Sequence, residues 1–233
     1  MTGVPLIVAR PEPGAGVTVR KARAMGLDAH ACPLFAVAPL DWTPPDADSF
    51  DALMLTSANA ARHAGGSLDR YAGLPVHAVG GATAEAARGA GLAVASAHAG
   101  GAQALLDALA AGSARRLLWL CGEDRIAIDP GELDIETVAV YAARPVDPPA
   151  SFAALVAAPS VALVHSARAG QRLAALVGQR APVAIAAISR QAADACGAGW
   201  RETAHAERPS GDAVLELAWR MCQTSMRKDA AGR

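Results

Sequence analysis

The stretch Val76–Leu92, VHAVGGATAEAARGAGL, predicts a strand, a tight turn and a helix in immediate succession. Its apolar start meets Gly80-Gly81, and the alanine-rich part that Thr83 opens stops at Gly89–Gly91. Such a turn presents backbone N–H groups and the positive end of a helix at the carboxyl edge of a sheet, where anions bind. We expect Thr83 to cap the helix and to offer its hydroxyl to a ligand.

The same pattern returns in Val183–Trp200, VAIAAISRQAADACGAGW, where Gly199 lies 108 residues after Gly91. Two further pairs of segments match in the same order and at nearly this spacing, the second more weakly: Leu53–His63 with Ala162–Arg172, and Ala97–Leu106 with Ala204–Leu215. Alanine and glycine are abundant, so one short match could arise by chance. The shared order favours duplication, and the sequence therefore predicts two similar lobes.

The composition bounds the class of protein. The chain has 233 residues, of which 52% are hydrophobic and 18% charged, enough for one large domain or two small ones. The formal net charge of −1 gives no sign of a nucleic-acid or membrane partner. No apolar stretch approaches the length of a membrane span or of a secretion signal. The four cysteines form no CxxC pair, so we expect a reduced, cytoplasmic protein without a metal site.

Short apolar strands alternate with helical segments along most of the chain, a pattern typical of an α/β fold with parallel sheets covered on both faces. The expected strands are Leu6–Ala9, Ala29–Cys32, Ala52–Leu55, Val76–Val79, Ala93–Ser96, Leu117–Leu120, Thr137–Val140, Val161–His165, Val183–Ile188 and Glu202–Ala204. The expected helices are Gly16–Met25, Asn59–His63, Thr83–Ala90, Ala102–Ala110, a weak one near Asp129–Leu133, and Gly211–Met221.

The strands at the two ends of the chain suggest a discontinuous domain. Two strands near the start and three near the end would each make a poor sheet, but together they make an adequate one. We therefore expect an outer lobe of residues 1–36 and 147–223 and an inserted lobe of residues 41–140. Extended, proline-marked segments of residues 33–41 and 138–147 would run side by side as linkers, and residues 224–233 would form a flexible tail.

Ligands of such sheets bind at the carboxyl ends of the strands. That edge carries Arg10, Ser57, Gly80, Gly81, Thr83, Cys121, Gly122, Ser166, Ser189 and Gln191. Hydroxyls, amides and backbone N–H groups predominate, without paired carboxylates, a metal cluster or a nucleophile–base pair. No GxGxxG follows a strand and no P-loop motif exists, so nucleotide binding is not indicated. This lining suits a polyanionic organic ligand better than hydrolysis.

Each candidate also has a structural interpretation. Ser57 and Ser166 could simply cap helices, and Gly80-Gly81 could be an ordinary tight turn. Arg10 and Arg125 could bind carboxylates or remain solvated.

Two further residues stay open in the same way. His165 ends an apolar strand, where a satisfied core histidine is commoner than a catalytic one. Tyr141, on the second linker, could pack on a lobe or place its phenol over a cleft and donate a proton to a leaving hydroxyl.

Six short motifs together resemble the uroporphyrinogen-III synthase family. They are Val8-Ala9-Arg10-Pro11, Leu55-Thr56-Ser57-Ala58-Asn59-Ala60, Val79-Gly80-Gly81-Ala82-Thr83-Ala84, Leu120-Cys121-Gly122-Glu123, Val140-Tyr141-Ala142-Ala143 and Arg208-Pro209-Ser210-Gly211. Each motif is loose, but their order and spacing span nearly the whole chain. The resemblance implies two flavodoxin-like lobes joined by a two-stranded β-ladder.

The resemblance also implies an activity. Linear hydroxymethylbilane closes to uroporphyrinogen III with loss of water and inversion of the last pyrrole ring, through azafulvene and spiro-pyrrolenine intermediates and without a cofactor. The implied protein is a monomeric, cytoplasmic lyase of porphyrin and heme biosynthesis that could receive its substrate from hydroxymethylbilane synthase. The other interpretation of the same polar sheet edges is a bilobed binding or regulatory module without turnover, although such proteins usually carry an export signal.

By resemblance, Tyr141 matches the linker tyrosine that is the best candidate for proton donation, and Ser57, Thr83 and Ser166 match hydroxyls that contact substrate. The full expected substrate-binding set is Arg10, Ser57, Asn59, Gly81, Thr83, Gly122, Ser166, Ser189 and Gln191. The chain departs from the family where many members have Gly-Pro-Thr-Thr, because it has Ser189-Arg190-Gln191-Ala192 instead. The threonine hydroxyl is missing there, and Gln191 or a backbone N–H would have to replace it.

Overall fold

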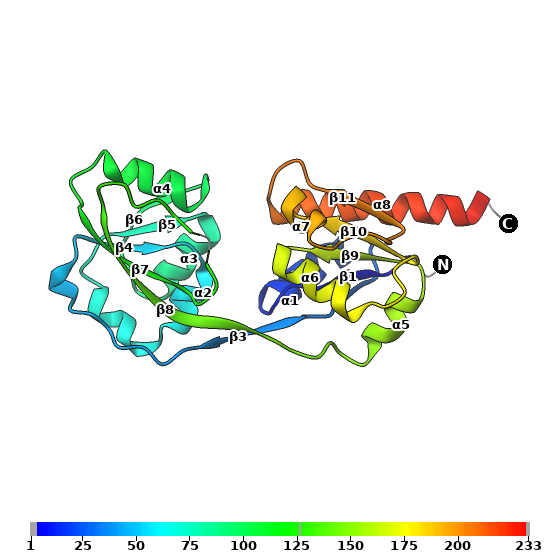
Figure 1. The fold of residues 1–233 in the computed structure, drawn as a ribbon, viewed down its shortest axis with the longest axis horizontal. Helices are drawn as coiled ribbons and strands as arrows, with labels where there is room; N and C mark the ends of the chain where they lie inside the picture. Colours follow the sequence, from blue (N-terminus) through cyan, green and yellow to red (C-terminus); the bar gives the residue numbers. More distant parts are fainter. Residues whose placement is uncertain (1–3, 126, 232–233) are drawn as a thin grey trace. The chain divides into compact units, whose positions relative to one another are not determined.

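The computed structural model describes residues 4–125 and 127–231 and divides into two compact units (Figure 1). The first unit comprises the chain up to residue 36 together with residues from 145 onward, and the second comprises residues 37–144. The chain therefore passes between the units twice, once within β3 (Phe35–Pro39) and once within β8 (Asp134–Pro145).

The first unit contains a parallel sheet of five described strands in the order β11-β10-β9-β1-β2. Its strands are β1 (Leu6–Val8), β2 (Ala29–Ala31), β9 (Ser160–Val164), β10 (Val183–Ala187) and β11 (Glu202–His205). The expectation that strands from both ends of the chain share one sheet is confirmed. β9 and β10 are buried along their whole length, because helices cover both faces of this sheet.

Helices from both ends of the chain cover the first sheet. On one face, α1 (Gly14–Ala24) and α8 (Gly211–Ala231) bury Val19, Val214 and Ala218 against Leu6 and Leu163. α6 (Ala167–Leu176) and α7 (Arg190–Asp194) pack on each other and on β9 and β10, and α5 (Ser151–Ala157) precedes β9.

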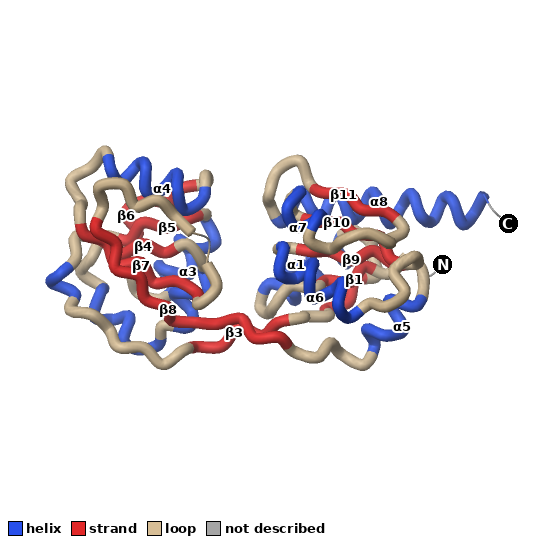
Figure 2. Tube along the Cα trace, in the orientation of Figure 1, coloured by secondary structure: helices blue, strands red, loops and turns tan. Residues whose placement is uncertain are grey.

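The second unit has six described strands in the order β3-β8-β7-β4-β5-β6 (Figure 2). Its other strands are β4 (Ala52–Leu55), β5 (Val76–Val79), β6 (Val94–His98) and β7 (Arg116–Gly122). α2 (Ala58–His63) and α3 (Gly81–Gly89) share a core with one face, and α4 (Gly101–Ala110) with the other. Two short 3₁₀ helices, Ala47–Ser49 and Gly65–Tyr71, lie before β4 and after α2.

The two sheets share one strand order. β11-β10-β9-β1-β2 in the first unit corresponds to β6-β5-β4-β7-β8 in the second. The repeated sequence segments fall on matching elements: β4-α2 with β9-α6, β5-α3 with β10-α7, and β6-α4 with β11-α8. The repeat in the sequence is therefore a structural repeat. Each half of the chain gives two of these strands to one sheet and three to the other.

Many boundaries shift by one or two residues from the expectations, and four differences matter more. The expectation of a helix near Asp129–Leu133 is wrong, because Pro130 and Gly131 break a helix. The segment is a turn, in which the N–H of Leu133 donates to the carbonyl of Pro130. β8 is much longer than Thr137–Val140. α8 continues past Met221 to Ala231, so most of the expected tail is helical, while residues 232–233 lie outside the described residues.

The fourth difference concerns the stretch Val76–Leu92, where the helix begins earlier than expected. α3 begins at Gly81, and its N-cap is Gly80, with no side-chain cap. The expectation that Thr83 caps this helix is wrong, because Thr83 lies inside the first turn and its side chain is buried. Gly80 has φ +79°, a left-handed conformation that favours glycine, so the backbone turns into the helix two residues earlier than expected.

None of the helices in the described ranges combines the length and the apolar character that crossing a membrane requires.

Close packing of α6 against α7 predicts that Gly170→Ala destabilises the first unit. A Cβ at this position would lie 2.9 Å from the carbonyl oxygen of Ala192 and 2.9 Å from Sγ of Cys196. Overpacking of this kind costs about 1–3 kcal/mol, which outweighs the gain in helix propensity of up to about 1 kcal/mol. Urea unfolding should show the loss. Gly178→Ala is the control, since a Cβ there meets nothing within 4 Å. Equal stability of both variants and the parent would contradict this packing.

Candidate active site

The carboxyl ends of β4 and β5 lead directly into helices. Ser57 is the N-cap of α2, and its Oγ accepts a hydrogen bond from the N–H of Asn59 at 3.2 Å. After β5, the carbonyl of Gly80 accepts from the N–H groups of Thr83 and Ala84, both at 3.2 Å. The first turn of α3, which starts at Gly81, therefore presents N–H groups and its positive end to the edge where Ser57 lies.

Tyr141 reaches this edge from β8. It pairs with Gly122 of β7, and the register between the two strands shifts between Cys121 and Gly122. The ring lies over Gly122: a Cβ there would be 2.8 Å from Cζ and 3.0 Å from Oη of the tyrosine. The N–H of Glu123 donates to the backbone carbonyl of Tyr141 at 2.9 Å. A glycine at the end of β7 is thus what allows the aromatic ring to occupy this place.

The phenol of Tyr141 meets groups from two other elements. Ser57 lies near Gly122, since the two follow the paired strand residues Leu55 and Leu120 by two positions each. The ring of His63 is tilted against that of Tyr141 at 6.3 Å between centroids. Burial raises the pKa of Tyr141, and the side chain of Ser57 partly opposes this rise. A phenol with a raised pKa stays protonated at neutral pH, which is the form that a proton donor needs.

His63 is a member of this cluster that the sequence did not indicate. It is the last residue of α2, and burial, with a smaller contribution from the positive charge of Arg62, lowers the pKa of its imidazole. The ring is therefore neutral at neutral pH. α2 spans only Ala58–His63, which is too short for a helical period to show which face His63 occupies.

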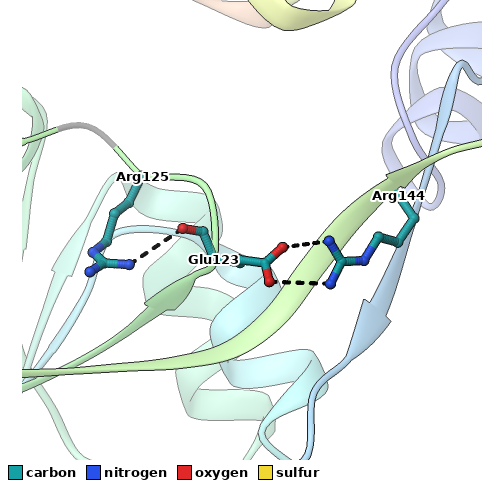
Figure 3. A network of polar contacts seen from close by, with 3 residues as sticks. All are labelled: Glu123, Arg125 and Arg144. Atoms are coloured by element: carbon teal, nitrogen blue, oxygen red, sulfur yellow. Dashed lines mark hydrogen bonds and ion pairs between the residues drawn. The ribbon is translucent and has the colours of Figure 1, made fainter.

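An ion pair connects the loop after β7 to β8 (Figure 3). Nη1 and Nη2 of Arg144 contact the two carboxylate oxygens of Glu123 at 2.5 Å and 3.2 Å, and Nη1 of Arg125 donates to the carbonyl of Glu123 at 3.3 Å. Both charged side chains of the pair are about half exposed, so the pair adds little to stability. Its two-point geometry orients the loop that follows Gly122. Arg125, a candidate for carboxylate binding, holds this loop.

The other predicted residues lie at the carboxyl edge of the first sheet. Ser166 caps α6 by accepting from the N–H of Ala169 at 3.2 Å, and Ser189 caps α7 by accepting from that of Ala192 at 3.3 Å. The capping interpretation of Ser57 and Ser166 is thus confirmed.

Arg10 follows β1, and its guanidinium lies over Gly14, where a Cβ would come within 2.5–2.8 Å. Gln191, in the first turn of α7, is exposed.

The predicted residues therefore fall into two groups. The second unit brings together Ser57, Asn59, Gly81, Thr83, Gly122 and Tyr141, and the first unit brings together Arg10, Ser166, Ser189 and Gln191. Thr83 is only 5% exposed, so its hydroxyl faces the interior of its unit more than the edge.

The cysteines do not supply a nucleophile to either group. All four are buried and none is paired with another. Burial raises the pKa of Cys32, Cys196 and Cys222 to about 11 and also raises that of Cys121, so they remain thiols at neutral pH. Within the described ranges, no three histidine, cysteine or acidic side chains come close enough together to hold a metal ion.

His165, just after β9, is half-buried, with both ring nitrogens buried, but it is not the satisfied core histidine that the alternative expected. Neither ring nitrogen has a hydrogen-bond partner in the part of the chain that the structure describes. Burial, reinforced by the positive charge of Arg10, lowers the pKa of His165 to about 3 from an ordinary value of 6.5. The imidazole is therefore held neutral in the folded protein.

This burial predicts a loss of stability in acid. The unfolded chain protonates His165 near pH 6.5 and the folded protein only near pH 3, so acidification through this window favours unfolding. At 1.36 kcal/mol per pH unit, the loss is of the order of 3 kcal/mol between pH 7 and pH 4. His165→Phe should remove this dependence of the unfolding free energy on pH, measured by urea unfolding at several pH values. His205→Gln, at an exposed position, should retain this slope. An unchanged slope in His165→Phe would contradict the assignment.

Two α/β units with matching parallel sheets, each with hydroxyl and N–H groups at the carboxyl edge of its sheet, are typical of an α/β enzyme. The chain belongs to the uroporphyrinogen-III synthase (HemD) family, whose model matches residues 16–216. Its activity is accordingly the cyclisation of hydroxymethylbilane to uroporphyrinogen III, a lyase reaction of porphyrin and heme biosynthesis.

Solved structures show the same fold. The uroporphyrinogen-III synthetase of Helicobacter pylori matches with a TM-score of 0.66 at 16% identity, over 94% of this chain and 99% of that one. A mutant uroporphyrinogen III synthase of the extreme thermophile Thermus thermophilus matches with a TM-score of 0.54 at 16% identity, over 95% and 99%. No curated protein matches the sequence.

Proposed function

We propose that ring closure uses the phenol of Tyr141 as the proton donor, with substrate carboxylates held by the donor groups at the carboxyl edges of the sheets. The observation that carries this proposal is the position of Tyr141, whose ring lies over Gly122 and whose phenol meets Ser57. The phenol is in its acid form at neutral pH, which supplies the proton, although burial raises its pKa and makes it a weaker acid.

The proposed chemistry begins when the hydroxyl on the first ring departs. The pyrrole nitrogen supplies electrons, the carbon–oxygen bond breaks, and the phenol proton joins the leaving hydroxide to give water, a phenolate and a protonated azafulvene. The substituted carbon of the last ring then attacks, giving a spiro pyrrolenine that fragments and recloses in the inverted orientation. The phenolate regains the proton that the last ring loses when its aromaticity returns. Proton donation contributes typically about 10²–10⁴-fold in rate.

Orientation of the two substrate ends contributes more than proton transfer. Holding both ends of a linear molecule in reacting geometry can remove roughly 7–11 kcal/mol of the barrier. The closure without inversion occurs without an enzyme, so the bound conformation must also select the isomer. This selection requires fixed contacts along the substrate rather than one strong one.

We assign the carboxylate contacts to groups from both units. In the second unit, α3 is longer than α2, and the N–H groups at its start bind a carboxylate. The residues beside this carboxylate are Ser57, Asn59, Gly81, Thr83 and Gly122. Thr83 acts by fixing this turn, since its side chain is buried and its N–H donates to the carbonyl of Gly80. In the first unit the start of α6 serves the same purpose beside Arg10, Ser166, Ser189 and Gln191.

At the departure from the family pattern, Ala192 is buried and cannot replace a threonine hydroxyl. The exposed Gln191 is therefore the side chain that we assign to this contact.

We also propose a finer architecture. Numbered along the chain, the first sheet has the order 2-1-3-4-5 of flavodoxin-like folds, which supports a flavodoxin-like outer lobe. Strands β4 to β8 of the second sheet have the order 3-2-1-4-5, which is a circular permutation of it. The adjacency of β3 and β8, with the N–H of Leu40 donating to Val140 at 3.0 Å, supports a two-stranded ladder as the linker. The proposed boundaries are an outer lobe of residues 1–36 and 147–223, linkers 33–41 and 138–147, and an inserted lobe 41–140.

In the cell, we propose a monomeric cytoplasmic enzyme that takes its substrate directly from hydroxymethylbilane synthase. Spontaneous closure of hydroxymethylbilane to the wrong isomer supports this hand-over, because a short transfer limits that loss.

Tyr141→Phe tests the proton donor. With hydroxymethylbilane made in situ by its synthase, we expect kcat to fall by about 10²–10⁴-fold and uroporphyrinogen I to increase, while the fold stays intact. Tyr71→Phe is the matched control: its hydroxyl donates to the carbonyl of Pro45 at 2.8 Å, and its loss should leave kcat unchanged. Wild-type kcat in Tyr141→Phe would remove the proposed role.

A further inference from the structure

Trp119 of β7 donates its indole N–H to a side chain, whereas Trp42 and Trp200 donate theirs to backbone carbonyls. Trp119 is 3% exposed, and its Nε1 lies 3.1 Å from Oγ1 of Thr56. Trp119 pairs in register with Met54, so the indole reaches along β4 toward its carboxyl end. A buried indole N–H needs an acceptor, and here the acceptor is the residue that joins β4 to Ser57.

The contact continues on the other side of the sheet. Trp119 packs in the core on the α4 face, whereas Tyr141 packs against the core on the α2 face. Thr56 receives the indole N–H. The next residue, Ser57, lies near Gly122 by the β4–β7 register, and the Tyr141 ring lies over Gly122. Thr56 and Ser57 therefore connect the buried indole to the proposed proton donor.

The hydrogen bonds that Ser57 accepts come from its own short helix, with the N–H of Ala60 bonded to its carbonyl at 3.0 Å. Its backbone is extended, with φ −149° and ψ 138°, and its Oγ accepts from the N–H of Asn59 at 3.2 Å. That cap belongs to a helix of six residues, Ala58–His63, which is too short to hold its own first turn rigidly. The bond from Trp119 fixes Thr56, the residue directly before Ser57.

We propose that Trp119 is a positioning residue for ring closure, which holds Thr56 and thereby keeps Ser57 against the phenol of Tyr141. This inference rests on the proposed role of Tyr141. Trp119 itself lies in the core and does not touch the substrate. Its loss should therefore act on the chemical step and leave substrate binding largely unchanged.

Three substitutions test the contact: Trp119→Phe removes the indole N–H, Thr56→Val removes the acceptor at constant shape, and Tyr141→Phe removes the phenol. We expect Trp119→Phe and Thr56→Val each to lower kcat about tenfold with KM within about twofold, since small misplacements of reacting groups cost rate. The two together should cost no more than either alone. In the Tyr141→Phe background, neither should lower kcat further.

The control is Trp200→Phe, which also removes one indole N–H, there bonded to the carbonyl of Cys196 at 3.0 Å. It should lower stability without changing kcat. A tenfold loss that persists in the Tyr141→Phe background, or unchanged kcat in both Trp119→Phe and Thr56→Val, would overturn the inference. If Trp119→Phe does not fold, Thr56→Val decides. Wild-type kcat in Tyr141→Phe alone would instead overturn the proton-donor role, and with it the reason for positioning.

Discussion

The position of the Tyr141 ring over Gly122 is the constraint on which the arrangement of this active site depends. β7 and β8 run in parallel until the register shifts between Cys121 and Gly122. At that point a side chain on β7 would collide with the tyrosine, and its absence lets the ring settle at the edge of the sheet. Burial there keeps the phenol protonated, and Ser57 from the neighbouring strand meets it. Strand pairing and a missing side chain together place the phenol at this edge.

Duplication explains why two sheet edges carry similar donors. In both units, serines that follow central strands cap the next helices, as Ser57 does for α2 and Ser166 for α6. The strand that corresponds to β7 in the first unit is β1, and Arg10 follows it with its guanidinium over Gly14. The shared framework therefore supports a phenol over a glycine in one unit and a guanidinium over a glycine in the other. Their places differ, because Tyr141 lies on β8, the counterpart of β2, whereas Arg10 follows β1.

Much of the fold could be predicted from local patterns. The strands Ala52–Leu55 and Val76–Val79 have the expected bounds, because short apolar runs end there in polar or glycine-rich turns. The repeat is visible in the sequence because its segments keep their order along the chain. The helix expected near Asp129–Leu133 is wrong because Pro130 and Gly131 outweigh the apolar spacing.

The contacts of the site could not be predicted, because they depend on pairing between strands. The hydrogen bond between Trp119 and Thr56 depends on the β4–β7 register. The position of the Tyr141 ring depends on a register shift between β7 and β8 that no local sequence pattern encodes. Burial of Thr83 follows from the helix starting at Gly81, which depends on the backbone angle of Gly80.

Gly122→Ala is the most direct test of the central claim. The added methyl would lie within 3.0 Å of the phenol, so the ring must move away from Ser57. We predict that kcat falls toward the level of Tyr141→Phe, while Gly73→Ala, where a Cβ meets nothing within 4 Å, keeps wild-type kcat. Wild-type kcat in Gly122→Ala, with a folded protein, would contradict the account.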